Sequence, residues 1–130
     1  MPIIFYTPDG TLAPQLRDDI VAQQIDIPPT LLHLLGYDRR FMSFGHDLLR
    51  TPPAQAWAVN YNNGIYQLVQ GNLLLQWDGD KTVGLYDYRA DRLLRHNLAG
   101  NHTAQPAMEQ TLKAIIQQYM KRMNENRLVE

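Results

Sequence analysis

The stretch from Gln24 to Gly36 constrains the fold most, because it encodes a short and almost wholly apolar helix. Asp26 can cap that helix by accepting hydrogen bonds from the free amides of its first turn, and the following prolines lack a donor that this turn leaves unpaired anyway. Gly36 ends it. Its aliphatic residues leave almost no polar face: Ile27, Leu31, Leu32, Leu34 and Leu35. We therefore expect a helix buried on most sides, and a plain core helix is the simplest interpretation.

This interpretation ranks the helix positions by the folding stability that each replacement should remove. Asp26→Ala should cost on the order of 1 kcal/mol through the lost cap. Leu31→Ala or Leu34→Ala should cost about 2 to 5 kcal/mol, because each would leave a cavity.

The order of residues in this stretch is more specific than its composition. Asp, an aliphatic residue, one free position, Pro-Thr-Leu-Leu and then Leu-Gly resembles a helix near the C-terminal end of sulfatases and of lipoteichoic-acid-synthase-like phosphoglycerol transferases, in the alkaline phosphatase superfamily. Three more segments agree in the family's order. Residues 2–8 resemble its Pro-strand-Pro segment, residues 43–49 its Phe-Gly-x-x-Leu-Leu element, and residues 85–99 its closing Leu-Tyr-Asp pattern, with Arg92 in place of Pro and Leu94 in place of Glu.

The resemblance implies displacement at a sulfate or phosphate ester, by an activated hydroxyl bound to a divalent metal. In the family, the nucleophile, the early acidic ligand and the Asp-His ligand pair all precede the segment where this chain begins. No catalytic residue and no metal ligand is therefore expected here. The resemblance implies a C-terminal fragment of such an enzyme, whose partner is the remainder of the catalytic domain. It also implies a parent in the cell envelope, at the inner membrane with a periplasmic or extracellular catalytic domain.

The composition is consistent with this hypothesis but does not by itself require it. The chain has 130 residues, a net charge of -1 and no cysteine, which excludes disulfides, thiolate metal sites and a cysteine nucleophile. Nothing resembles the basic stripe of a nucleic-acid binder. The chain contains no apolar run of about 18 residues and no signal peptide at its start. Because an apolar strand follows Met1 at once, we expect an excised piece of a longer protein.

Along the chain, the pattern predicts an α+β fold: the end of an alkaline-phosphatase-like α/β sheet over residues 1–53, and an antiparallel subdomain over residues 54–130, packed as one unit. Pro2 to Thr7 reads as a parallel-type strand buried on both faces. A turn follows at residues 8–10, then a loop to about residue 24, and after the helix a surface connection over residues 37–53. An exposed edge at residues 2–7 would favour pairing, including a homodimer of the isolated fragment.

Residues 57–88 change character to short strand-like runs separated by turn pairs. We predict strands at 57–61, 65–70, 73–77 and 82–88, joined by Asn63-Gly64, Gly71-Asn72 and Asp78-Gly79 into a four-stranded meander. Val83 and Leu85 should share the buried face. A final helix from about residue 104 to 124, capped by Thr103, should cover that face.

The histidines are the remaining candidates for chemistry. His46, followed by Asp47, is the substrate-side candidate, because in the family this connection approaches the active-site side of the main sheet; a turn residue is the alternative. His33 is expected to be hydrogen-bonded at the core edge. His96 and His102 fall in a polar loop and are expected to be solvated. No spacing matches a known ligand pattern, so no metal site is expected in this chain.

A second hypothesis treats the chain as a self-contained binding or interaction module. The meander is rich in aromatic residues, which either form a contact surface or fill cross-strand pairs and the core. These are Trp57, Tyr61, Tyr66, Trp77, Tyr86 and Tyr88.

Overall fold

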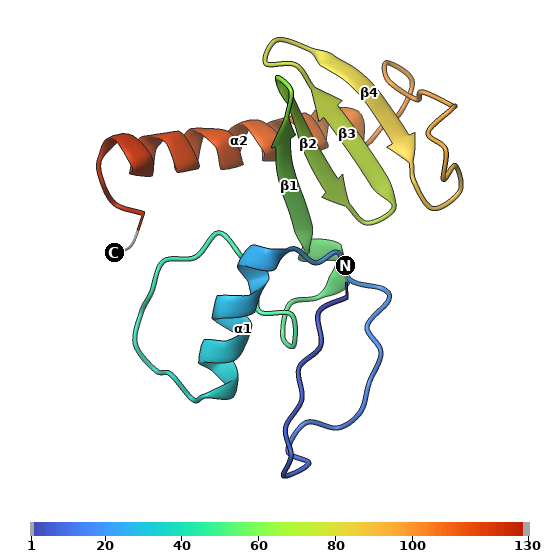
Figure 1. Cartoon of the computed structure of the whole chain (residues 1–130). Helices are drawn as coiled ribbons and strands as arrows, with labels where there is room; N and C mark the ends of the chain where they lie inside the picture. The colour runs from blue at the N-terminus through green and yellow to red at the C-terminus, as the bar shows by residue number, and fades with distance from the viewer. Residues whose placement is uncertain (1, 129–130) are drawn as a thin grey trace.

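A computed structural model describes residues 2–128 and has an α+β architecture. One short helix, α1 (Ile27–Leu34), lies among irregular segments at one end of a four-stranded sheet. The strands are β1 (Trp57–Asn62), β2 (Ile65–Gln70), β3 (Leu73–Trp77) and β4 (Thr82–Asp87). The long helix α2 (Gln105–Asn124) crosses one face of this sheet and extends beyond β1 (Figure 1).

The meander forms as predicted, in the order β1-β2-β3-β4 with every neighbouring pair antiparallel. Its turns follow from local chemistry. Asn63 and Gly64 both have positive φ, as a type I′ turn requires, whereas at the next turn only Gly71 does. These turns fix the register, which sets Val59, Leu68, Leu75 and Leu85 directly opposite one another across the four strands.

This cross-strand row is the centre of the core. Leu68, Leu75 and Leu85 are fully buried and pack with Met108 and Leu112 of α2. Sequence analysis wrongly placed Val83 on this face. The register shifts opposite Gln76 and Trp77, so that Val83 is skipped as a bulge and lies exposed.

The helix α2 begins and ends within a residue of the prediction. Its cap differs, because Ala104 occupies the N-cap position and no side chain supplies a capping hydrogen bond, so Thr103 is not the cap. Instead, His102 Nδ1 accepts a hydrogen bond from the Ala104 amide, at 3.2 Å. No helix of the described residues is long and apolar enough to cross a membrane.

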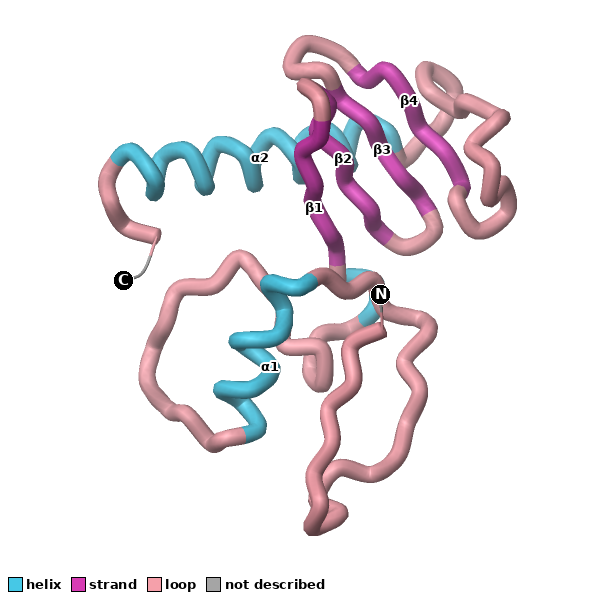
Figure 2. The backbone as a smooth tube through the Cα atoms, viewed as in Figure 1, coloured by secondary structure: helices cyan, strands magenta, loops and turns pink. Residues whose placement is uncertain are grey.

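The helix α1 also lies where it was predicted, and Gly36 ends it in a Schellman motif. The Tyr37 amide donates to Leu32 O and the Gly36 amide to His33 O, with Gly36 at φ 69°. The expected burial is wrong. Only Pro29 and Thr30 of this helix are buried, and Leu31 is 43% exposed. Irregular segments rather than a sheet lie beside the helix (Figure 2), and much of its apolar surface stays exposed.

The predicted parallel-type strand at Pro2–Thr7 is absent: these residues belong to no sheet in the structure. Exposure alternates along them, and Ile4 is 82% and Tyr6 81% exposed. The following turn is present, with the Gly10 amide donating to Thr7 O. Residues 11–23 form the predicted loop, which leads into a single 3₁₀ turn at Gln24–Asp26.

Candidate functional site

The segment 43–49 is locked onto the start of α1 by two buried polar side chains. Asp26 is fully buried, and its carboxylate accepts hydrogen bonds from the backbone amides of Gln23 and His46, both at 2.7 Å. The fully buried Thr30 hydroxyl donates to Asp26 O at 2.7 Å and accepts from the Leu48 amide at 3.0 Å. We call this arrangement the Asp26–Thr30 lock.

The lock corrects the expected role of Asp26. Its side chain makes no capping hydrogen bond to the first turn of α1. Its hydrogen bond from the Gln23 amide closes the preceding 3₁₀ turn, and its hydrogen bond from the His46 amide holds a loop about 20 residues further along the chain. An aspartate just before a helix that begins with prolines can either cap that helix or join a buried hydrogen-bond network. The neighbouring residues in the sequence do not show which role it has.

Two histidines accompany the lock, one from each side. His33 Nδ1 on α1 lies 2.7 Å from Asp47 Oδ2, a close contact that lacks hydrogen-bond geometry. His46 Nδ1 lies 3.6 Å from Asp26 Oδ1, and its ring meets Trp57 edge-on with centroids 4.8 Å apart. Each segment thus contributes one histidine and one aspartate, and the His46 side chain is only 17% exposed. Its substrate-side role stays a prediction.

The other two histidines lie elsewhere. His96 is 83% exposed and its Nδ1 lies 3.3 Å from Asp91 Oδ2, as expected of a solvated loop residue. His102 was expected to be solvated but is half-buried, because its Nδ1 turns inward to accept a hydrogen bond from the Ala104 amide before α2. Within residues 2–128 no three His, Cys, Asp or Glu side chains gather in a way that could hold a metal ion.

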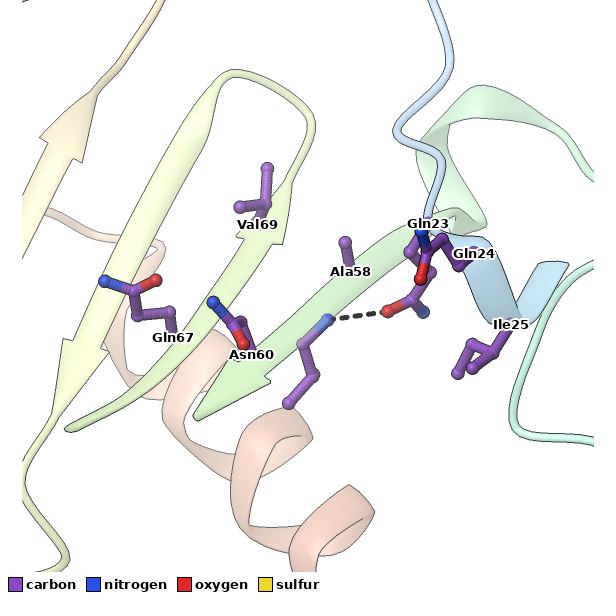
Figure 3. A pocket seen from close by; sticks show the side chains of 8 residues that line it. Gln23, Gln24, Ile25, Ala58, Asn60, Gln67 and Val69 are labelled. Atoms are coloured by element: carbon purple, nitrogen blue, oxygen red, sulfur yellow. Dashed lines mark hydrogen bonds between the residues drawn. The ribbon is translucent and has the colours of Figure 1, made fainter. Parts of the chain in front are cut away.

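Side-chain amides close both open edges of the sheet. At β1, the Gln23 side chain accepts from the Val59 amide and donates to Trp57 O, both at 3.2 Å. Figure 3 shows the first of these bonds beside a pocket of about 340 Å³ on the outer face of the sheet. Such a carboxamide occupies the donor and acceptor that another strand would use.

Asn97 does the same at β4. Its side chain accepts from the Leu85 amide at 3.0 Å and donates to Val83 O at 3.1 Å, and the Leu98 amide donates to Leu85 O at 2.7 Å. Asn97 falls within residues 85–99, which sequence analysis treated only as a motif, and neither Gln23 nor Thr30 was weighed there for a structural role. An amide residue adjoining a strand-like run is a weak signal, because loops are rich in such residues.

Three carboxylates organise turns, one on an exposed residue (Asp78) and two on half-buried residues (Asp87 and Asp91). Backbone amides donate to Asp78, Asp87 and Asp91, and these hydrogen bonds hold the pKa of each carboxyl below its usual value. Asp87 also accepts from the Asn72 side chain, and its carboxylate caps the turn after β4 through the amides of residues 89 and 90.

Glu109 is the exception, because it joins α2 to β4. Its carboxylate accepts from the Thr82 hydroxyl at 2.6 Å and from the side-chain amide of Gln105 at 2.9 Å, and the Lys113 ammonium lies 3.6 Å away. The Thr82 hydroxyl, then the Gln105 amide and the Lys113 charge, lower the pKa of Glu109. The Lys113 ammonium also lies 5.3 Å from the centre of the Trp77 ring, a cation–π distance.

The aromatic residues of the meander do not form one open platform. Tyr61, Tyr66 and Trp77 stand in a cross-strand row, with neighbouring centroids 4.5 and 5.8 Å apart. Their face of the sheet is the one that α2 partly covers. Tyr86 lies on the opposite face by register, and the Tyr88 hydroxyl donates to Gly71 O.

A hollow of about 680 Å³ lies where β1, the overhanging part of α2 and residues 42–44 meet. Its walls carry Phe44, Trp57, Tyr61, Tyr66, Ile116 and Tyr119, among others. Phe44 and Tyr119 meet edge to face across it, at 5.7 Å between centroids. We call this space the β1–α2 hollow.

Comparison of the chain with protein-family models, with curated proteins and with solved structures finds no match.

Proposed function

We propose that this chain is the C-terminal part of a sulfatase-like metal-dependent hydrolase or phosphoglycerol transferase that acts on sulfate or phosphate esters. One observation carries the proposal. Two segments that resemble separate family motifs, residues 26–36 and 43–49, meet at the Asp26–Thr30 lock. Asp26 and Thr30 of the first motif accept the amides of His46 and Leu48 in the second.

The lock gives the motif residues a physical reason for their identities. The glycine of Phe-Gly-x-x-Leu-Leu is Gly45, whose backbone lies against Ile25 so closely that a side chain has no room. The closing pattern over residues 85–99 ends in Asn-Leu at Asn97 and Leu98, and Asn97 completes the edge of β4. A resemblance confined to chance matches would not be expected to select the residues that hold the segments together.

In this proposal the chain supplies structure and no catalytic group. The activated hydroxyl and the divalent metal would belong to the upstream part, and the metal would serve there as a Lewis acid for the ester. His46 is the substrate-side candidate, since it is the histidine of the lock beside Trp57. The partner is the remainder of the catalytic domain, and the parent is proposed to work in the cell envelope.

The test begins upstream of the gene segment that encodes Met1. We expect the reading frame to continue through a Thr- or Ser-centred nucleophile motif and an Asp-His pair. The joined protein should hydrolyse an aryl sulfate or a bis-aryl phosphate ester with manganese, and replacement of the upstream nucleophile by alanine should abolish turnover. The 130-residue chain alone should show none. A native start at Met1, shown by mass spectrometry of the protein from its source, would overturn the proposal.

The second candidate is a self-contained binding module. The observation in its favour is that the sheet and α2 share one core and that side-chain amides close both sheet edges. Such a unit needs no further strand. Metal-dependent turnover by the joined protein, lost with the upstream nucleophile, would decide for the enzyme.

A further inference from the structure

The β1–α2 hollow has the size and lining of a small-molecule site. Its volume of about 680 Å³ falls within the range of roughly 300 to 1,000 Å³ that is usual for ligand pockets. Its walls come from both halves of the chain: residues 23, 25 and 42–44 on one side, and β1, β2, α2 and Leu128 on the other. A ligand there would therefore touch segments that are far apart in sequence.

The lining selects against charge. All of the residues that line the hollow are uncharged, and most are aromatic or aliphatic. A carboxylate or ammonium entering it would lose water without gaining an opposite charge, which is costly. An uncharged ligand meets no such penalty.

A few polar groups in the lining remain available. Tyr61, Tyr66 and Tyr119 line the hollow, and their hydroxyls have no hydrogen-bond partner among residues 2–128. Apolar walls with a few unpartnered hydroxyl groups suit a molecule with an apolar body and one uncharged polar end.

We propose that the β1–α2 hollow binds an uncharged amphiphile, with an alkyl or aromatic body against the aromatic walls and a hydroxyl-type end at the tyrosine hydroxyls. The inference does not depend on the enzyme proposal, because it uses only the walls of the hollow.

The test is fluorescence titration of the whole chain with N-phenyl-1-naphthylamine, an uncharged probe. We expect saturable binding, seen as a rise in probe fluorescence when the probe leaves water for the aromatic walls. Dodecanol should displace the probe more effectively than dodecanoate or dodecyltrimethylammonium. Equal displacement by all three would overturn the assignment of an uncharged ligand.

Two variants on one helix locate the site. Met120 lines the hollow and is 40% exposed, whereas Met123, one turn further on, does not line it and is 44% exposed. Met120→Glu should weaken probe binding by about tenfold or more, because it places a carboxylate against the apolar body, and Met123→Glu should leave binding unchanged. Circular dichroism checks that both variants fold. If Met120→Glu does not fold, Tyr119→Leu is used in its place. Equal binding by the lining variant and the Met123→Glu control would refute the site.

Discussion

The backbone of Gly45 lies against the carbonyl group of Ile25, so that a Cβ at residue 45 would stand 1.9 Å from that oxygen and 2.4 Å from its carbon. No rotamer change can relieve such a contact, because both partners are backbone. Gly45 therefore allows the 43–49 segment to approach α1 closely enough for His46 to donate to Asp26.

The first prediction follows from this contact. Gly45→Ala should destabilise the fold by about 3 kcal/mol, because the two segments must separate and loosen the Asp26–Thr30 lock. Gly10→Ala is the control: it has positive φ with open space around it, so backbone strain alone should cost about 1 kcal/mol. Denaturant melts measure both, and a smaller cost at Gly45 than at Gly10 would contradict the close packing.

The second prediction reverses the ranking drawn from the sequence. Asp26→Ala should cost more than Leu31→Ala, because it leaves two amide donors without an acceptor, at about 1 to 3 kcal/mol each. Leu31 is already 43% exposed, so its loss should cost about 1 kcal/mol or less. Asp26→Asn should fall between them, since it keeps one acceptor oxygen. Urea denaturation of the three variants gives the order, and a costlier Leu31→Ala would restore the capping account.

This reversal shows where sequence reasoning reached its limit. The meander and α2 were predictable, because turn pairs and apolar periodicity act within a few residues of one another. The burial of Asp26 and Thr30 depends on a loop about 20 positions away, and periodicity carries no information on such contacts. The prediction of a strand at Pro2–Thr7 was wrong for the same reason. The apolar run fits a buried strand, but a strand requires a neighbouring strand, and these residues pair with none in the structure.

The candidate site was predictable to a smaller extent. His46 was singled out from its motif and does lie in the lock, but its contact with Trp57 joins residues from segments that sequence analysis treated apart. The β1–α2 hollow was not predicted at all, because it exists only where α2 extends past β1 and meets residues 42–44.

The third prediction concerns pH. The pKa of Glu109 is lowered in the folded protein, so its contribution to stability is fully present above its ordinary value of 4.5 and is lost as pH falls through the folded value. Glu109→Gln should remove this part of the acid dependence, worth about 1 kcal/mol or less because the side chain is partly exposed.

Thermal melts between about pH 3 and pH 6 measure this dependence. Glu125→Gln is the control, because it removes a carboxylate at the other end of α2, where Glu125 forms an exposed ion pair with Arg127 at 3.8 Å. If Glu109→Gln and Glu125→Gln flatten the profile equally, the Thr82 and Gln105 hydrogen bonds do not carry the effect.

The last prediction concerns the apolar segment at residues 2–7. Ile4 and Tyr6 are more than four-fifths exposed, and no strand of the structure pairs with this segment. An unpaired apolar segment is a template for association, and in the proposed parent it would pair with strands of the main sheet. We expect the isolated chain to associate as its concentration rises, and Ile4→Lys to shift its mass by light scattering towards the monomer. Leu16→Lys is the matched control, because Leu16 is 86% exposed but lies outside the segment, and it should leave association unchanged. A chain that stays monomeric, with the amides of residues 3–7 strongly protected from hydrogen exchange, would show that the domain buries this segment unaided.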